Sequence, residues 1–174
     1  MYHAAYASDG TSYAQALKAA FPDRLQPGWV DFSGLVLFNE NVNVLHKRMK
    51  GIANWLIATD EMQSLDLGYF GVGVSAATAL AAAAFRPDAI HAIVAVAPRI
   101  DLVSPSLSRV VTPTLLMVAE RDTQGLDMSR RALVELTSNT TLDFVRETRE
   151  RGLPHTLEAI PGVANVFENA QSRN

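Results

Sequence analysis

The sequence contains no cysteine, and this absence removes several kinds of chemistry. Disulfide bonds, thiolate catalysis and cysteine-ligated zinc are excluded, whereas the redox compartment is left open. The histidines are also too few and too scattered for a metal site. No two of them stand at a ligand spacing such as H-x-x-x-H; they are His3, His46, His91 and His155. We therefore expect neither a metal nor another cofactor.

An excess of positive charge and long hydrophobic runs are absent too. The 15 Lys and Arg residues against 18 Asp and Glu residues give a net charge of -3, and no basic run tracks along a candidate helix. We therefore expect no nucleic-acid partner. The longest apolar stretch, 76–85, is too short to span a bilayer, and the first ten residues lack the features of a signal peptide. This pattern predicts a cytoplasmic protein that does not enter a membrane.

What the sequence does contain is typical of a globular domain. Hydrophobic residues make up 48% of the 174 residues and charged residues 19%, which is an ordinary balance for a chain with a sizeable core. We find no internal repeat and no linker-like segment. The composition therefore predicts one domain over residues 1–174.

Apolar runs rich in Val and Ile alternate with segments of helical period, which predicts an α/β fold with a parallel sheet. Strands are predicted at 66–72, 89–97, 113–120 and 155–160, and less clearly at 29–38, where Gly34 interrupts the run. Helices are predicted at 11–21, 43–58, 74–85, 126–137 and 142–152. Ligands bind such sheets at the carboxyl ends of the strands.

The stretch "DLGYFGVGVSAATALAAAA" (66–84) has the layout that often presents a serine nucleophile. It combines a buried strand, a glycine-rich turn and an alanine-rich helix. The usual spacing there is G-x-S-x-G. Here the five residues are Gly71-Val72-Gly73-Val74-Ser75, so that glycine and serine have exchanged places.

From about Gly51 onward the chain resembles the α/β-hydrolase fold, and within it the dienelactone hydrolase-like group of small esterases and lactonases. "IANWL" and the stretch through "AIVAVAPRIDL" are similar to the family's helix, nucleophile strand, elbow helix and next strand. "TPTLLMVAERDT" is similar to the strand and turn of the catalytic acid, and "RGLPHTLEAIPGVANVFE" to the last strand and histidine loop. The resemblance implies a three-layer α/β/α fold with a mostly parallel sheet of about five or six strands.

Transferred residue by residue, the resemblance puts the catalytic acid at Asp122, the nucleophile at Gly73 and the histidine at Asn165. Glycine has no nucleophile, and the amide of asparagine is not a base. Two of the three triad members are therefore absent, which implies a degenerate triad. Asp122 is then expected to remain as a relic or to cap nearby backbone N–H groups.

The beginning of the chain also departs from the family. Members normally have two or three strands before an oxyanion-hole loop with an H-G-x-G-like sequence, and "YHAAYAS" (2–8) is a poor match to that loop. We therefore expect the sheet to lack its first strands. An uncovered sheet edge has to be protected or paired, so we also expect a homodimer.

An alternative is that the active site has shifted to Ser75, since residues 73–77 fit G-x-S-x-A. Against this, "LGYFG" places Ser75 in the first turn of the helix, where serine is common. A shifted serine would also need a base, and His3 is the only histidine expected at the correct end of the sheet. His155 and His91 stand at the starts of their strands.

Three functional hypotheses remain open. In the first, a non-catalytic relative of the hydrolases binds a protein partner or a small anionic or carbonyl-bearing ligand at the backbone N–H groups of Val74 and Ser75. The second is a weak esterase or lactonase that uses Ser75. The third is a fragment or decayed hydrolase without activity.

Overall fold

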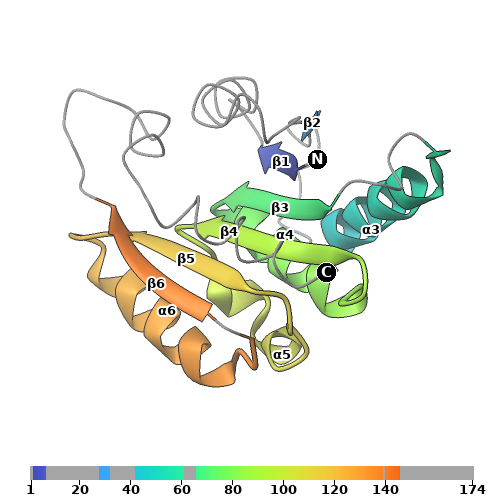
Figure 1. Cartoon of the computed structure of the whole chain (residues 1–174). Helices are drawn as coiled ribbons and strands as arrows, with labels where there is room; N and C mark the ends of the chain where they lie inside the picture. The colour runs from blue at the N-terminus through green and yellow to red at the C-terminus, as the bar shows by residue number, and fades with distance from the viewer. Residues whose placement is uncertain (1, 7–27, 32–41, 61–65, 139, 146–174) are drawn as a thin grey trace.

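The computed structural model describes residues 2–6, 28–31, 42–60, 66–138 and 140–145 (Figure 1). The described strands form one six-stranded sheet in the order β2-β1-β3-β4-β5-β6, and every pair is parallel. The strands are β1 Tyr2–Tyr6, β2 Gly28–Asp31, β3 Leu67–Val72, β4 Ile90–Val96, β5 Thr114–Ala119 and β6 Thr140–Val145. The predicted α/β class and parallel sheet are confirmed.

The described helices form a row along one face of this sheet (Figure 1). α4 packs on β3 and β4, and α6 packs on β5 and β6. The short helix α5 contacts both α4 and α6, and α3 packs on the outer side of α4. Their bounds are α3 Val42–Ala58, α4 Val74–Phe85, a 3-10 turn η2 Ile100–Leu102, α5 Ser104–Leu107 and α6 Thr123–Glu135. Within the described residues no helix is both long and apolar enough for a membrane span.

Most of the predicted elements within the described residues are confirmed. The predicted strands 66–72, 89–97 and 113–120 correspond to β3, β4 and β5, and the start of the uncertain run 29–38 corresponds to β2. Helices α3 and α4 lie where they were predicted, and α6 begins three residues earlier than expected. The predicted helix 11–21 and strand 155–160 lie outside the described residues.

The predicted helix at 142–152 is wrong in its first residues, because Thr140–Val145 form strand β6. The segment "TTLDFV" is rich in β-branched and aromatic residues, and it pairs with all of β5 in a continuous parallel register. The i, i+4 charge pairs that suggested a helix begin only at position 146. Tertiary pairing therefore decided the conformation of 142–145, and 146–152 lie outside the described residues.

The interpretation of 2–8 as a loop is also wrong over its first five residues. Tyr2–Tyr6 form β1, which is held between β2 and β3. His3 pairs with Tyr69 in this register, three positions before the end of the strand. It therefore does not lie in a loop at the carboxyl edge, which removes the reason for considering it as a base.

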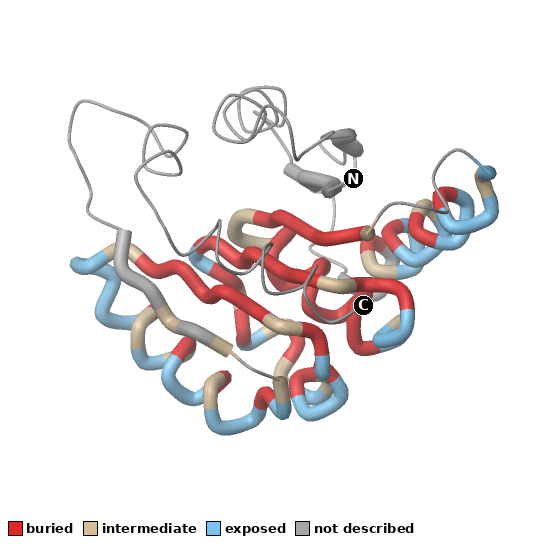
Figure 2. Tube along the Cα trace, viewed as in Figure 1, coloured by how far each residue is buried: buried red, intermediate tan, exposed pale blue. Residues whose placement is uncertain are grey.

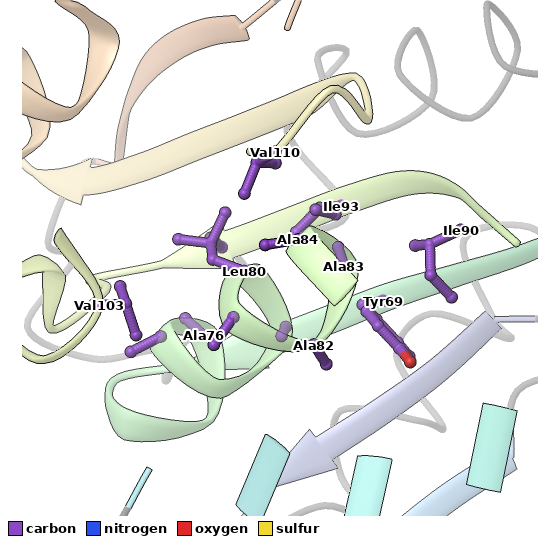
Figure 3. Close-up of a cluster of buried hydrophobic side chains, with 14 of the residues drawn as sticks. Tyr69, Ala76, Leu80, Ala82, Ala83, Ala84, Ile90, Ile93, Val103 and Val110 are labelled. Carbon is purple, nitrogen blue, oxygen red and sulfur yellow. The ribbon is translucent and has the colours of Figure 1, made fainter. Parts of the chain in front are cut away.

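The core is centred on α4 and the strands beneath it (Figure 2). Every residue of α4 from Ser75 to Ala84 is buried, and most are alanine. Such small side chains let the helix axis approach the sheet closely. Leu80 fills the space between α4 and β4 beside Val103 and Val110 (Figure 3). This packing fixes the position of the N-terminus of α4, which lies at the carboxyl edge of the sheet.

Candidate functional site

Gly73 forms the tip of the turn that joins β3 to α4. Its backbone has φ 59° and ψ -120°, in a region that favours glycine. Its amide donates a hydrogen bond to the Val96 carbonyl oxygen at 2.9 Å, and its own carbonyl oxygen accepts from the amides of Ala77 at 3.2 Å and Arg99 at 3.3 Å. The tip is therefore tied both to α4 and to the end of β4.

Gly71 and Gly73 have different surroundings on this turn. A Cβ atom at Gly71 would lie 2.6 Å from the Ala76 backbone nitrogen, so glycine is needed for the helix to approach the strand. A Cβ atom at Gly73 would meet no heavy atom within 4 Å among the described residues. The tip of the turn thus has room for a side chain that this protein does not carry.

Ser75 is the second residue of α4, and only 4% of its surface is exposed. Its neighbour Val74 is half-buried and lies closer to the tip. A serine in the first turn of a helix is common, and a buried hydroxyl group is poorly accessible to a substrate. This placement favours the interpretation of Ser75 as a structural helix residue.

The first turn of α4 leaves backbone N–H groups without partners inside the helix. This applies to Val74, Ser75 and Ala76, because the residue four positions before each of them belongs to β3 and supplies no carbonyl within the helix. Among the described residues, no side chain caps this helix. Aligned amides and the helix dipole make this end of α4 favourable for a negatively charged group.

Asp122 lies three residues after β5 and is the N-cap of α6. Its Oδ1 accepts a hydrogen bond from the Gly125 amide at 2.8 Å. A Cβ atom at Gly125 would lie 2.3 Å from Asp122 Oδ2, so glycine at that position makes room for the carboxylate. The capping role considered for Asp122 is therefore present in the structure.

The loop after β4 holds two features that the sequence interpretation missed. Ala97 has a positive φ of 45°, and its amide donates to the Met117 carbonyl oxygen at 2.7 Å. Arg99 donates two hydrogen bonds to the Asp101 carboxylate, at 2.9 Å and 2.8 Å. These bonds lower the pKa of Asp101. The signal in the sequence is the R-x-D pattern shortly after an apolar strand, which predicts a local pair between Arg99 and Asp101 in this loop.

Gly73, Ala97 and Asp122 thus follow three adjacent strands at the same edge of the sheet. β3 and β5 are about 10 Å apart, since β4 lies between them and neighbouring strands are about 5 Å apart. The structure brings Gly73 and Arg99 together through a backbone hydrogen bond. Asn165 lies outside the described residues, as does His155.

The other described histidines lie away from this edge. His46 of α3 stacks on Phe85 at the C-terminal end of α4, with 4.9 Å between ring centroids. His91 Nε2 lies 3.7 Å from an Asp66 carboxylate oxygen near the start of β4, at the opposite end of the strand from Ala97. Neither histidine is placed to act as a base for a residue on the elbow.

Comparison with known proteins gives two kinds of similarity, although no family model matches the chain. Putative phosphoribosyl transferases from two strains of Mycobacterium tuberculosis are each 34% identical over 125 residues. These residues are 71% of this chain but only 28% of each relative, so the chain spans less than a third of their length.

Hydrolases are among the solved structures that this chain is similar to. A dienelactone hydrolase from Anabaena variabilis has a TM-score of 0.79 and 24% identity, covering 97% of this chain and 84% of that chain. A monoacylglycerol lipase from Paleococcus ferrophilus has a TM-score of 0.71 and 13% identity, covering 96% of this chain and 94% of the lipase. At these identities the similarity concerns the arrangement of the backbone.

Proposed function

We propose that this chain, which has the α/β-hydrolase fold, is a non-catalytic binding module whose site is the carboxyl edge of the sheet at Gly73. The observation that carries this proposal is the glycine itself. It has a positive φ at the tip of the strand-to-helix turn, and a Cβ atom there would meet none of the described residues within 4 Å, but it has no side chain. A serine-type attack on a carbonyl carbon has no nucleophile there.

The remaining groups at this edge are suited to binding rather than to catalysis. The amides of the first turn of α4 have no acceptor within the helix, and the backbone amide of Arg99 binds the Gly73 carbonyl oxygen at the tip, while the Arg99 guanidinium pairs with Asp101. Asp122, at the position of the catalytic acid, uses one carboxylate oxygen to cap α6. Backbone donors at a helix N-terminus favour a small anionic or carbonyl-bearing ligand.

A phosphate-bearing ligand is the more specific form of this proposal. Two relatives are described as putative phosphoribosyl transferases, and that description belongs to proteins much longer than this chain. Phosphate oxygens also match the donors available here, because the amides at a helix N-terminus bind phosphate well. We propose no transferase activity for this chain, because the shared segment is only 28% of those relatives.

Titration calorimetry with inorganic phosphate tests the binding proposal. Arg99→Gln is expected to weaken phosphate binding about threefold, because it leaves the negative charge of Asp101 unbalanced in the loop that contacts the tip. The matched control is Arg130→Gln on exposed α6, which should change the affinity by less than about twofold. Absence of phosphate binding, or an equal loss in both variants, would argue against this edge as the site.

A fluorophosphonate probe tests the non-catalytic part of the proposal. The wild type is expected to remain unlabelled and to hydrolyse p-nitrophenyl acetate no faster than Ser75→Ala. Labelling that disappears in Ser75→Ala would instead establish the alternative of an esterase that uses Ser75. The double variant Gly73→Ser, Asn165→His is expected to be labelled at position 73 if the elbow has been assigned correctly, since the added side chain has room.

A homodimer through the edge strand β2 is a further part of the proposal. β2 is the last of the described strands on its side of the sheet, so one row of its backbone groups is not paired with any of them. Light scattering coupled to size-exclusion chromatography should give about twice the mass of the 18.9 kDa chain. A mass of one chain at high protein concentration would contradict the dimer.

A further inference from the structure

The exposed side of α3 carries an unusual concentration of positive charge. Lys47, Arg48 and Lys50 are all exposed there, and the 17 residues of the helix include no aspartate or glutamate. The chain as a whole has a net charge of -3, so this local excess opposes the overall charge. Within the described part of the chain, none of the three cations forms an ion pair.

Trp55 lies on the same helix and has 63% of its surface exposed. The buried side of α3 consists of other residues, namely Leu45, Met49, Ala53 and Leu56, which pack toward α4. Figure 2 shows this division, with the exposed residues along the outer side of the helix. The tryptophan is therefore not needed to attach α3 to the rest of the protein. Lys47, Arg48, Lys50 and Trp55 are called the α3 surface below.

The neighbouring residues extend the positive charge of the α3 surface. Arg109 lies over the ring of Phe85, with its guanidinium carbon 4.8 Å from the ring centroid, and His46 of α3 stacks on the same ring. The acidic neighbour Asp88 is paired with Arg86, which also donates a hydrogen bond to Asn54 of α3. Because Arg86 neutralises the Asp88 carboxylate, Asp88 does little to offset the positive charge of the α3 surface.

We infer that the α3 surface is a docking site for an acidic protein segment. Complementary charge favours such a partner, and an exposed tryptophan among basic residues is typical of the few residues that dominate protein interfaces. The α3 surface includes no residue of the site at Gly73, so this inference does not depend on the proposed function. It assigns the module a second, separate contact.

A membrane and a nucleic acid fit the same surface less well. Among the residues of α3 whose burial the structure describes, the exposed large apolar groups are Trp55 and Ile57, and with the half-exposed Phe85 of α4 they give a small area for insertion into lipid. Nucleic-acid binding uses positive charge that follows the phosphate backbone over several contacts. The three cations lie within a single helical turn on a chain of net negative charge, so they could contact only a short length of a phosphate backbone.

Binding of fluorescein-labelled poly-L-glutamate at low salt, followed by anisotropy, tests this inference. The triple variant Lys47→Gln, Arg48→Gln, Lys50→Gln is expected to weaken binding about tenfold, since each exposed charge pair contributes a modest amount. Trp55→Ala is expected to weaken it about fivefold. All substituted positions are exposed, and circular dichroism would verify that each variant is folded.

The matched control removes three exposed arginines from the other end of the described helix row, as Arg121→Gln, Arg130→Gln, Arg131→Gln. It should change the affinity by less than about twofold, because the total charge changes equally but the α3 surface is intact. No measurable binding, or equal losses in the two triple variants, would overturn the inference. Tighter, α3-dependent binding to phosphatidylserine vesicles or to duplex DNA would overturn it in favour of those partners.

Discussion

Gly71 and Gly73 are two positions apart on one turn, yet they are constrained for different physical reasons. At Gly71 the constraint is space, because the backbone of Ala76 lies where a Cβ atom would be. At Gly73 the constraint is conformation, because a Cβ atom would meet none of the described residues within 4 Å but φ is positive. The identity of a residue in this turn therefore follows from its packing as much as from its dihedral angles.

Gly71→Ala is accordingly expected to destabilise the protein more than Gly73→Ala. Forcing a Cβ atom against backbone should cost about 3 kcal/mol, whereas a positive φ for alanine costs about 1–2 kcal/mol. Urea denaturation of the two variants measures the difference. Equal losses of stability would mean that the close approach of α4 to β3 is relieved by a small shift of the helix.

The buried hydroxyl group of Tyr69 is expected to lower the free energy of unfolding, and replacing Tyr69 by phenylalanine should remove this effect. The Tyr69 side chain is buried in the core, and its hydroxyl group has no hydrogen-bond partner among the described residues. Figure 3 shows the hydroxyl group pointing away from the labelled apolar cluster. Tyr69→Phe is expected to raise the free energy of unfolding by about 1 kcal/mol at neutral pH, because the unpaired polar group is lost. Thermal or urea unfolding would measure it.

Tyr69→Phe should also change how the free energy of unfolding depends on pH above neutrality. Burial raises the pKa of Tyr69 above its usual value near 10. A raised folded-state pKa contributes stability that is fully present below pH 10 and is lost as the pH rises toward the folded-state pKa. Tyr69→Phe should therefore lose less stability above pH 10 than the wild type. Identical slopes in the two proteins would contradict the burial of an unpaired phenol.

At the level of elements, α6 depends on its cap. Asp122 both ends the turn after β5 and accepts a hydrogen bond from the Gly125 amide of the first helical turn. Asp122→Ala is expected to cost about 1 kcal/mol of stability, and Asp122→Asn much less, because asparagine is also a good N-cap. Thermal denaturation of both variants would test this. A large loss in Asp122→Asn would show that the charge, rather than the cap, is required.

The elements also show where local patterns are misleading. The charge pairs at 146–151 suggested a helix that included 142–145, although these four residues belong to β6. The β-branched and aromatic residues of 140–145 favour a strand, whereas the charge pattern that follows favours a helix. Pairing with β5 over six positions settles the choice, because every residue of the segment gains a partner on a buried strand.

At the level of the whole molecule, stability should be greatest at β4. This strand lies between β3 and β5, is almost entirely buried, and is covered by α4. Its amides are expected to exchange with solvent only through global unfolding, whereas those of α3, which packs mainly on one other helix, should exchange sooner. Hydrogen exchange followed by mass spectrometry measures this order. Faster exchange in β4 than in α3 would contradict it.

The sequence by itself determined the α/β class, the central strands and the glycine-rich turn between β3 and α4. Those features are local, because continuous apolar runs, an alanine-rich helix and the spacing of glycines are encoded within short segments. Tertiary structure decided that Tyr2–Tyr6 and Thr140–Val145 are strands and that Asp122 caps a helix. It also placed Arg99 beside the elbow. Each of these depends on partners distant in sequence or on the geometry of a turn, which residue patterns do not specify.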